Sequence, residues 1–202
     1  MSKPNDKHNP GVVLTIDAGG TYFKSALVQS DGSVLADSFH QVRSGSQGTK
    51  ADIVGAYGDI IRHASELVHE RGERIRGVGV ATPGPFDYER GMSLMTHKFK
   101  AIREVPLRDE IRSFGLPSET PIHFMQDVHA FLSGEHWTGA AKGIDNVAAV
   151  TLGTGLGFGL MKGGEILHNG KGGPYLVIFN RPYKDGILED VISRRGIVRR
   201  YQ

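Results

Sequence analysis

Apolar runs rich in β-branched residues, separated by glycine bends, dominate the start of the chain. Residues 12–16 form one such run before an aspartate and a Gly-Gly-Thr bend, and residues 25–28 form the next. β-branched residues favour strands, and glycine tolerates the dihedral angles of tight turns. The pattern therefore predicts a strand, a turn and a returning strand. The turn signal Asp31-Gly32 predicts a further strand at 33–36.

A helical period begins at Ala51, where apolar residues recur at every third or fourth position as far as Val68, and Arg71-Gly72 closes the helix. Residues 75–81 alternate glycine with valine and predict a buried strand that the prolines of 82–85 end. In chain order, the pattern then predicts a helix at 107–114, a strand at 121–125, a helix ending near 140–143, and strands at 147–152 and 158–161. The last stretch, 187–201, is predicted to be helical, although Gly196 is unfavourable within a helix.

The unit of strand, glycine turn and strand occurs twice, at residues 17–21 and 153–157. Each copy heads a segment in which strand pairs are followed by a helix, which is the order that an internal duplication leaves. The sequence therefore predicts an α/β protein with two lobes facing each other over a cleft. We expect a disordered tail at residues 1–10, a first lobe at 11–122 and a partial second lobe at 123–202.

Composition narrows the class of protein. The chain has 202 residues, of which 39% are hydrophobic and 23% charged, as in soluble globular proteins. The net charge of +2 argues against nucleic acid and membrane surfaces as partners. The absence of cysteine excludes disulfides and thiolate metal sites. With no apolar run near the ~20 residues that span a bilayer and a polar start without a secretory core, we expect a cytoplasmic protein.

Both glycine turns are candidate phosphate sites. Backbone N–H groups in such turns can hold phosphate oxygens, and Asp17 is placed to face a metal ion. The second turn lacks the helix and acidic residue of a dinucleotide fingerprint and the lysine of a Walker A loop. Taken alone, the first turn favours an ordinary hairpin and the second is equally consistent with a hairpin tip or a phosphate site, but the repetition of the pattern favours phosphate.

Asp127 stands where a predicted strand ends and a helix begins. It is either the N-cap of that helix or a general base at a strand end facing a cleft. Spacing alone favours the cap.

Two further groups of residues have ordinary structural interpretations. The histidines His97, His123, His129, His136 and His168 show no metal-ligand spacing, so surface or packing roles are favoured. The arginines Arg194, Arg195, Arg199 and Arg200 are typical of a solvated helix face.

The motifs, taken in order from about Val12 to the end of the chain, resemble the ROK family of sugar kinases and repressors. This family has the actin-like (ribonuclease H-like) ATPase fold of duplicated lobes. The matching segments are 17–21 and 153–157 for the two phosphate motifs, 77–85 for the glycine-rich strand ending in Pro-Gly-Pro, 105–108 for the start of a helix, 126–130 for Asn-Asp-x-x-Ala, and 168–170 for the loop after the second turn.

The resemblance implies ATP-dependent phosphorylation of a hexose or related sugar, with Asp127 as the catalytic base and ATP and Mg²⁺ as cofactors. Asp17 would hold the metal ion. The residues implied to bind ATP are Asp17, Gly19, Gly20, Thr21, Lys24, Gly153, Thr154, Gly155 and Gly157, and those implied to contact the sugar are Pro83, Gly84, Gln126, Asp127 and Glu189. A small-molecule sugar is the implied partner, and the family allows a homodimer.

The chain departs from the family pattern in its sugar and zinc segments. Gly172-Gly173 is followed by 174–179 instead of Ala-Gly-Glu-x-Gly-His, so the glutamate that binds sugar and the histidine that binds metal are missing. The cysteine-rich zinc loop is also missing, and no zinc is expected. Gln126 replaces the asparagine before the catalytic aspartate, and Lys98 replaces the asparagine of the sugar loop. Glu189 resembles the glutamate of the family's Leu-Glu pair.

ROK kinases are longer than this chain, so the second lobe is expected to be incomplete and to expose apolar surface. Two alternatives to a kinase stay open. One is a truncated, non-catalytic relative that binds a sugar or a partner. The other is a ROK-type transcriptional regulator, which the short segment of about ten residues before the first apolar run disfavours, because such regulators carry a helix-turn-helix there.

Overall fold

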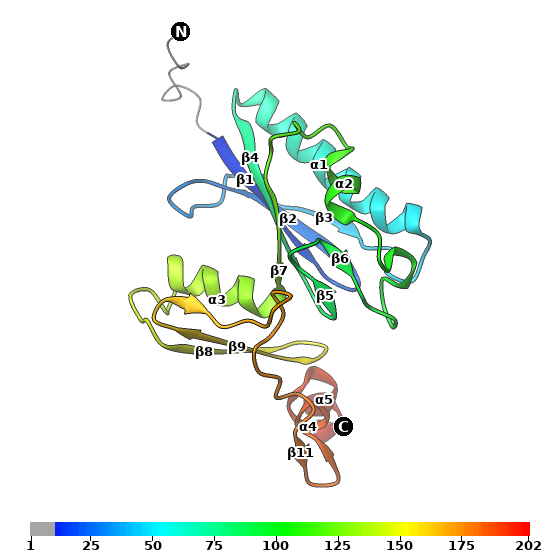
Figure 1. Cartoon of the computed structure of the whole chain (residues 1–202), viewed down its shortest axis with the longest axis vertical. Coiled ribbons are helices and arrows are strands. Elements are labelled where there is room, and N and C mark those ends of the chain that lie inside the picture. The colour runs from blue at the N-terminus through cyan, green and yellow to red at the C-terminus, as the bar shows by residue number, and fades with distance from the viewer. Residues whose placement is uncertain (1–10) are drawn as a thin grey trace. The chain divides into compact units, whose positions relative to one another are not determined.

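The computed structural model describes residues 11–202, so the expected tail at 1–10 lies outside the described residues. The chain forms two compact units, the first ending at Met125 and the second spanning Gln126–Gln202. Figure 1 labels their helices and strands.

A five-stranded sheet in the order β3-β2-β1-β4-β7 organises the first unit. Its strands are β1 (Gly11–Ala18), β2 (Tyr22–Val28), β3 (His40–Arg43), β4 (Arg74–Thr82) and β7 (Ile122–Gln126), the last of which ends one residue inside the second unit. β1 pairs antiparallel with β2 and parallel with β4. The predicted strand, glycine turn and returning strand are therefore confirmed.

The helices α1 (Lys50–Glu70) and α2 (Leu107–Arg112) pack with this sheet around the larger core (Figure 1). The short elements between β4 and α2 are β5 (Phe86–Asp87), β6 (Met92–Ser93) and the 3₁₀ helix η2 (Lys100–Ile102). α1 begins at a capping box, in which Thr49 and Asp52 each bond the other's backbone N–H. Phe23 of β2 is fully buried and packs against Tyr57 of α1 and Phe99.

The strand predicted at 33–36 is wrong. Only an isolated bridge joins Val34 to Val28, and the third strand of the sheet is His40–Arg43. The reason lies in Ser38, whose side-chain oxygen accepts the N–H of Leu27 at 3.1 Å. A side chain thus takes the place of a strand partner along this part of β2, and regular pairing begins only at Ser25 with His40.

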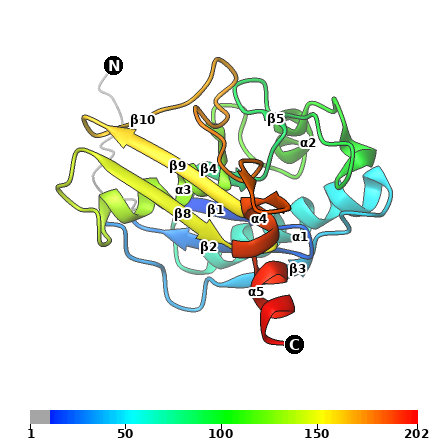
Figure 2. The same ribbon diagram turned by 90° about the horizontal axis from the view of Figure 1, so that it is seen from below.

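The second unit contains a three-stranded sheet in the order β10-β9-β8, on which α3 (Asp127–Trp137) packs (Figure 2). The strands are β8 (Val147–Leu152), β9 (Leu156–Lys162) and β10 (Glu165–Ile166). The buried core between helix and sheet consists of Val128, Leu132, Ala149 and Met161. The strands predicted at 147–152 and 158–161 are confirmed, whereas the helix predicted to end near 140–143 ends at Trp137.

The last part of the chain forms a hairpin of β11 (Pro182–Tyr183) and β12 (Gly186–Ile187), followed by α4 (Leu188–Ile192) and α5 (Arg194–Tyr201). The single helical stretch predicted at 187–201 is therefore divided, and the break falls at Ser193, whose backbone is extended. Ser193 caps α5 by accepting the Gly196 N–H at 3.3 Å. Gly196 lies within α5. Glycine is required at this position because a Cβ would stand 2.4 Å from the carbonyl oxygen of Asp190 in α4.

Large apolar side chains are exposed in the second unit, in agreement with the expectation of exposed apolar surface. The most exposed are Phe131, Trp137, Ile144, Val150, Leu152, Tyr175, Phe179, Tyr183, Ile192, Ile197, Val198 and Tyr201. Within residues 11–202, no helix combines the length and apolar character needed to cross a bilayer.

Candidate functional site

The carboxyl end of the first unit's sheet gathers one group of sequence-predicted site residues. Because β1 and β4 are parallel, with Asp17 opposite Ala81, both strands end at the same edge of the sheet. Asp17 also lies directly opposite Lys24 in the antiparallel pair of β1 and β2, and both side chains are exposed. Opposite residues in such a pair project from the same face about 5 Å apart. An acidic and a basic group therefore flank the first glycine turn together.

A serine loop holds the carbonyl groups of this turn. The hydroxyl of Ser44 donates to the Gly20 carbonyl oxygen at 2.8 Å, and the Ser44 N–H donates to the Thr21 carbonyl oxygen at 3.1 Å. The hydroxyl of Ser46 donates to the same Gly20 oxygen. Ser44 is buried. These bonds fix the shape of the turn from the side of the 44–46 loop.

The two glycines of the turn differ in how strictly they are required. A Cβ at Gly19 would lie 2.8 Å from the Tyr22 carbonyl oxygen, which belongs to the backbone and cannot easily move. A Cβ at Gly20 would meet only the Lys98 side chain, at 3.8 Å. The tight return of the chain into β2 therefore needs glycine at position 19, whereas position 20 has space over it.

The segment after β4 lies at the same sheet edge. β4 ends at Thr82, whose carbonyl oxygen accepts the Tyr88 hydroxyl at 3.1 Å, and Pro83 and Gly84 follow directly. The Gly84–Pro85 peptide bond is cis. The loop of Lys98 is attached to this region because the Phe99 N–H donates to the Ser46 carbonyl oxygen at 2.9 Å. Lys98 therefore lies near the first glycine turn, and Pro83 and Gly84 follow the strand that ends at the same edge of the sheet.

Asp127 is the first residue of α3 in the second unit, and the N-cap is Gln126, which makes no side-chain cap bond. The interpretation of Asp127 as the N-cap is therefore wrong by one position. Its Oδ1 accepts the N–H of the next residue, Val128, at 2.8 Å. Asp127 is exposed while Val128 is fully buried, so packing of Val128 holds the start of the helix and leaves the carboxylate facing outward.

Two glycines of β9 allow α3 to pack closely. A Cβ at Gly159 would contact Val128 at 3.4 Å and Leu132 at 3.6 Å. Gly157 lies inside β9, opposite Thr151, and a Cβ there would stand 2.2 Å from the Thr151 hydroxyl oxygen. Gly157 was predicted to bind ATP. The structure gives it a packing role at the start of β9, next to the turn proper at 153–155.

The second glycine turn is held by its own backbone and by the helices α4 and α5. Within the turn, the Gly153 N–H donates to the Gly155 carbonyl oxygen at 3.0 Å. The N–H of Arg194 donates to the Gly153 carbonyl oxygen at 2.9 Å, and the Leu156 N–H donates to Oε2 of Glu189 at 2.8 Å. Glu189, predicted as a sugar contact, therefore has its carboxylate bonded to this turn.

Two buried polar side-chain atoms lie at the start of α3. His129 is 2% exposed, and its Nε2 and the Oε1 of Gln126 are buried without a hydrogen-bond partner among the described residues. Burial lowers the pKa of His129, and the neighbouring His168 lowers it further, against opposing effects of the Asp127 carboxylate and the Gly172 backbone. The imidazole is therefore held neutral at neutral pH.

Asp17 is the carboxylate that the sequence assigns to a metal ion. Within residues 11–202, no three histidine, aspartate or glutamate side chains gather as a metal site. Mg²⁺ in phosphoryl-transfer sites is usually bound through one or two carboxylates and the substrate phosphates. A single exposed carboxylate at the glycine turn, with the Thr21 hydroxyl nearby in sequence, fits an ion that arrives with a phosphate group.

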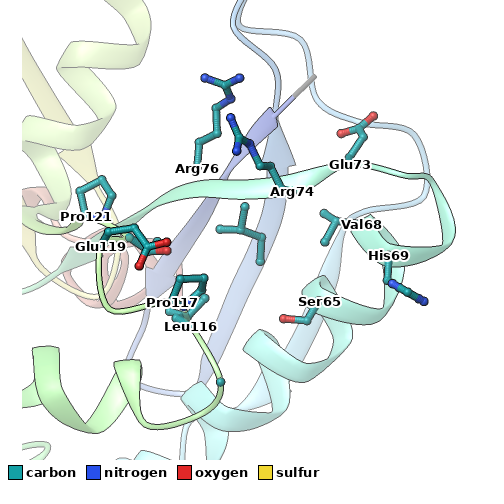
Figure 3. Close-up of a pocket in the computed structure, with 13 residues that line it drawn as sticks. Ser65, Val68, His69, Glu73, Arg74, Arg76, Leu116, Pro117, Glu119 and Pro121 are labelled. Carbon is teal, nitrogen blue, oxygen red and sulfur yellow. The ribbon is translucent and has the colours of Figure 1, made fainter. Parts of the chain in front are cut away.

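A cavity of about 490 Å³ lies elsewhere on the first unit (Figure 3). It is formed at the amino end of β4, by Arg74 and Arg76, and by the end of α1 and the segment before β7. Charges of both signs line it, including Glu73 and Glu119. None of the sequence-predicted site residues borders this cavity, so it is not the candidate site.

Ser44, Ser46 and Arg194 contact the glycine turns but were not among the predicted site residues. The sequence does show a small polar loop at 44–48. Its contact with Gly20 joins residues 24 and 26 positions apart, and no local pattern encodes such a pairing.

Comparison with known proteins gives consistent matches. The model of the family described as the ROK family matches residues 13–202. A glucokinase of Thermotoga maritima is 32% identical, over 93% of this chain and 59% of that protein. A putative xylose repressor of Caldicellulosiruptor sp. is 26% identical, over 94% of this chain and 48% of that protein.

Among solved structures, a ROK family glucokinase from Streptomyces griseus in complex with glucose and AMPPNP is similar with a TM-score of 0.75 and 28% identity. The match covers 94% of this chain and 59% of that one. The chain therefore spans about three fifths of the length of these two glucokinases.

Proposed function

This chain belongs to the ROK family and has its actin-like α/β fold, and on that basis we propose that it transfers the γ-phosphoryl group of ATP to a hydroxyl group of a hexose. The observation that carries the proposal is the exposed Asp127 carboxylate, fixed at the start of α3 by the buried Val128. A carboxylate held in this way has the chemistry of a general base.

The acceptor hydroxyl must lose its proton as its oxygen attacks phosphorus. Oδ1 of Asp127 accepts the Val128 N–H, which orients the carboxyl group and leaves Oδ2 to accept the hydroxyl proton. General-base catalysis of this kind contributes about 10²–10⁴-fold to a rate. Since phosphoryl transfer needs little covalent chemistry from the protein, the remaining acceleration would come from positioning and charge stabilisation.

The two glycine turns would hold the phosphates through the backbone N–H groups of Gly20 and Thr21 in one turn and of Thr154 and Gly155 in the other. The N–H groups of Gly19 and Gly153 bond the carbonyl oxygens of Asp17 and Gly155, so these two glycines would contribute the bend of each turn. Lys24 would add a positive charge beside the first turn. Mg²⁺, when bound, would neutralise charge on the phosphate oxygens, and Asp17 would hold it with the Thr21 hydroxyl.

We propose that Pro83, Gly84 and Gln126 recognise the acceptor. The Gln126 Oε1 is a buried acceptor without a partner among the described residues, and a sugar hydroxyl that displaced the groups covering it would supply that hydrogen bond. The Lys98 side chain, which lies near Gly20, adds a positive charge. We propose a small-molecule hexose as the ligand.

A second candidate function is sugar binding without phosphoryl transfer. The observation that favours it is the similarity over 94% of this chain to a putative xylose repressor. The two candidates make different predictions for the same assay, because only a kinase forms ADP in proportion to the sugar added.

The decisive experiment measures ADP formation by the full chain with ATP, Mg²⁺ and a panel of hexoses. We expect turnover that depends on the hexose, and a fall in kcat of about 10²–10⁴-fold in Asp127→Asn. Asp127→Asn should bind AMPPNP as the parent protein does. The matched control is Asp145→Asn, an exposed loop aspartate of the same unit, which should retain full activity.

Equal turnover in Asp127→Asn would remove Asp127 as the base. A folded protein that binds a hexose and forms no ADP would support the non-catalytic candidate.

A further inference from the structure

Glu189 contacts the second glycine turn through a backbone group. Its Oε2 accepts the Leu156 N–H at 2.8 Å, across 33 positions of sequence. Leu156 is buried and is the first residue of β9, directly after Gly153-Thr154-Gly155. The bond therefore fixes the point at which the turn becomes a strand.

The corner between α4 and α5 supports the same turn from a second direction. The Arg194 N–H donates to the Gly153 carbonyl oxygen at 2.9 Å, so both ends of the turn are attached to one short segment. This segment is ordered by Ser193, which is 1% exposed and caps α5. Figure 2 shows α4 beside the end of β8 and β9 from which the turn extends.

Gly155 is shaped to admit the Glu189 side chain. A Cβ at position 155 would stand 2.7 Å from Oε2, closer than real contacts allow. Relief would come from moving the glutamate side chain, which would break its bond to Leu156. The glycine and the glutamate are therefore complementary, and substitution of either should release the turn.

The charge of Glu189 argues against direct contact with phosphate. A carboxylate repels phosphate oxygens, and here Oε1 lies 3.7 Å from the Arg195 guanidinium, an opposite charge that offsets it. Oε2 is occupied by the Leu156 N–H. Both carboxylate oxygens of Glu189 thus have partners inside the second unit, as expected of a residue that supports the glycine turn.

We propose that Glu189 is a positioning residue that holds the second glycine turn in the conformation that receives the nucleotide phosphates. Its link to the nucleotide rests on the proposed function, whereas its hold on the turn does not. The predicted role of Glu189 as a sugar contact is the competing outcome of the test.

The first measurement is hydrogen–deuterium exchange of the full chain without ligands. We expect Glu189→Ala to raise exchange of the Leu156 amide and of the peptide covering 153–157 by at least tenfold in rate. Glu189→Gln keeps a side-chain oxygen that can accept the Leu156 N–H and should stay near the parent protein. Gly155→Ala should behave as Glu189→Ala does. The control is Glu165→Ala, at an exposed carboxylate of β10.

The second measurement is titration with AMPPNP, together with the KM for the hexose where turnover occurs. Glu189→Ala and Gly155→Ala should each weaken AMPPNP binding by about tenfold, which is about 1.4 kcal/mol, without changing the KM for the hexose. Glu189→Gln should restore the affinity. Fluorescence of Trp137, the only tryptophan, reports whether each variant is folded.

Unchanged exchange at 153–157 in both Glu189→Ala and Gly155→Ala would overturn the proposal. A raised KM for the hexose with unchanged AMPPNP affinity would also overturn it, in favour of the sugar contact. Should Glu189→Ala fail to fold, Gly155→Ala and Glu189→Gln carry the same comparison. Neither exchange nor AMPPNP titration requires turnover, so absence of kinase activity would count against the proposed function alone.

Discussion

The hydroxyl of Ser44 donates a hydrogen bond to the carbonyl oxygen of Gly20 at 2.8 Å, and this bond joins a buried serine to the first glycine turn. A net loss of about 1 kcal/mol is typical when one such bond is removed. The consequence for function is larger than for stability, because the bond determines where the turn's backbone lies.

Ser44→Ala should therefore lower the stability of the protein by about 1 kcal/mol and weaken AMPPNP binding several-fold. The matched control is Ser38→Ala, which removes another buried serine of the same unit, bonded to Leu27 and Leu35 away from the turn. Urea denaturation and AMPPNP titration of both variants check this. Comparable loss of AMPPNP affinity in Ser38→Ala would show that general destabilisation accounts for the effect.

Gly19→Ala should be more destabilising than Gly20→Ala. The added Cβ at position 19 meets a backbone carbonyl at 2.8 Å, whereas at position 20 it meets only a lysine side chain at 3.8 Å. Overpacking against rigid structure costs about 1–3 kcal/mol. The comparison is made by urea denaturation followed by circular dichroism, and equal stability of the two variants would contradict the geometry of the turn.

Asp17→Asn should raise the Mg²⁺ concentration needed for half-maximal turnover by about tenfold, because an amide is a weaker ligand for Mg²⁺ than a carboxylate. Chelation of the metal should abolish turnover of the parent protein. Asp109→Asn, which alters an exposed aspartate of α2 in the same unit, serves as the control. A Mg²⁺ requirement that is identical in Asp17→Asn and the parent would place the ion elsewhere.

The second unit should lose stability as the pH falls below about 6.5, the ordinary pKa of histidine. Burial lowers the pKa of His129 in the folded state, so below pH 6.5 the unfolded chain binds a proton that the folded chain does not. One such proton changes the free energy of unfolding by at most about 1.4 kcal/mol per pH unit. Above pH 7.5 His129 is neutral in both the folded and the unfolded chain, so its titration should no longer change the free energy of unfolding.

Denaturation of the second unit, followed by Trp137 fluorescence between pH 5.5 and 8 in buffers of equal ionic strength, measures this dependence. His129→Gln should flatten the profile below pH 6.5. His123→Gln, at an exposed histidine of β7, should leave it steep. A His129→Gln profile as steep as that of the parent would assign the titration to another group.

The amino-acid sequence alone determined those helices, strands and turns whose formation depends on residues close together in the chain. The first glycine turn, α1 from its first apolar residues to its glycine stop, and the strand that leads into Asp127 all follow from patterns within a few positions, since propensity and period act locally. The order of the motifs was also sufficient to identify the family, which the match over residues 13–202 confirms.

Only the tertiary structure decided how the turns are supported. Ser44 reaches Gly20 across 24 positions and Glu189 reaches Leu156 across 33, and neither contact leaves a local pattern. The same is true of the missing strand at 33–36, where the Ser38 side chain replaced a backbone partner. Helix breaks and glycine roles, as at Ser193 and Gly157, depend on what packs against them, so sequence period alone could not assign them.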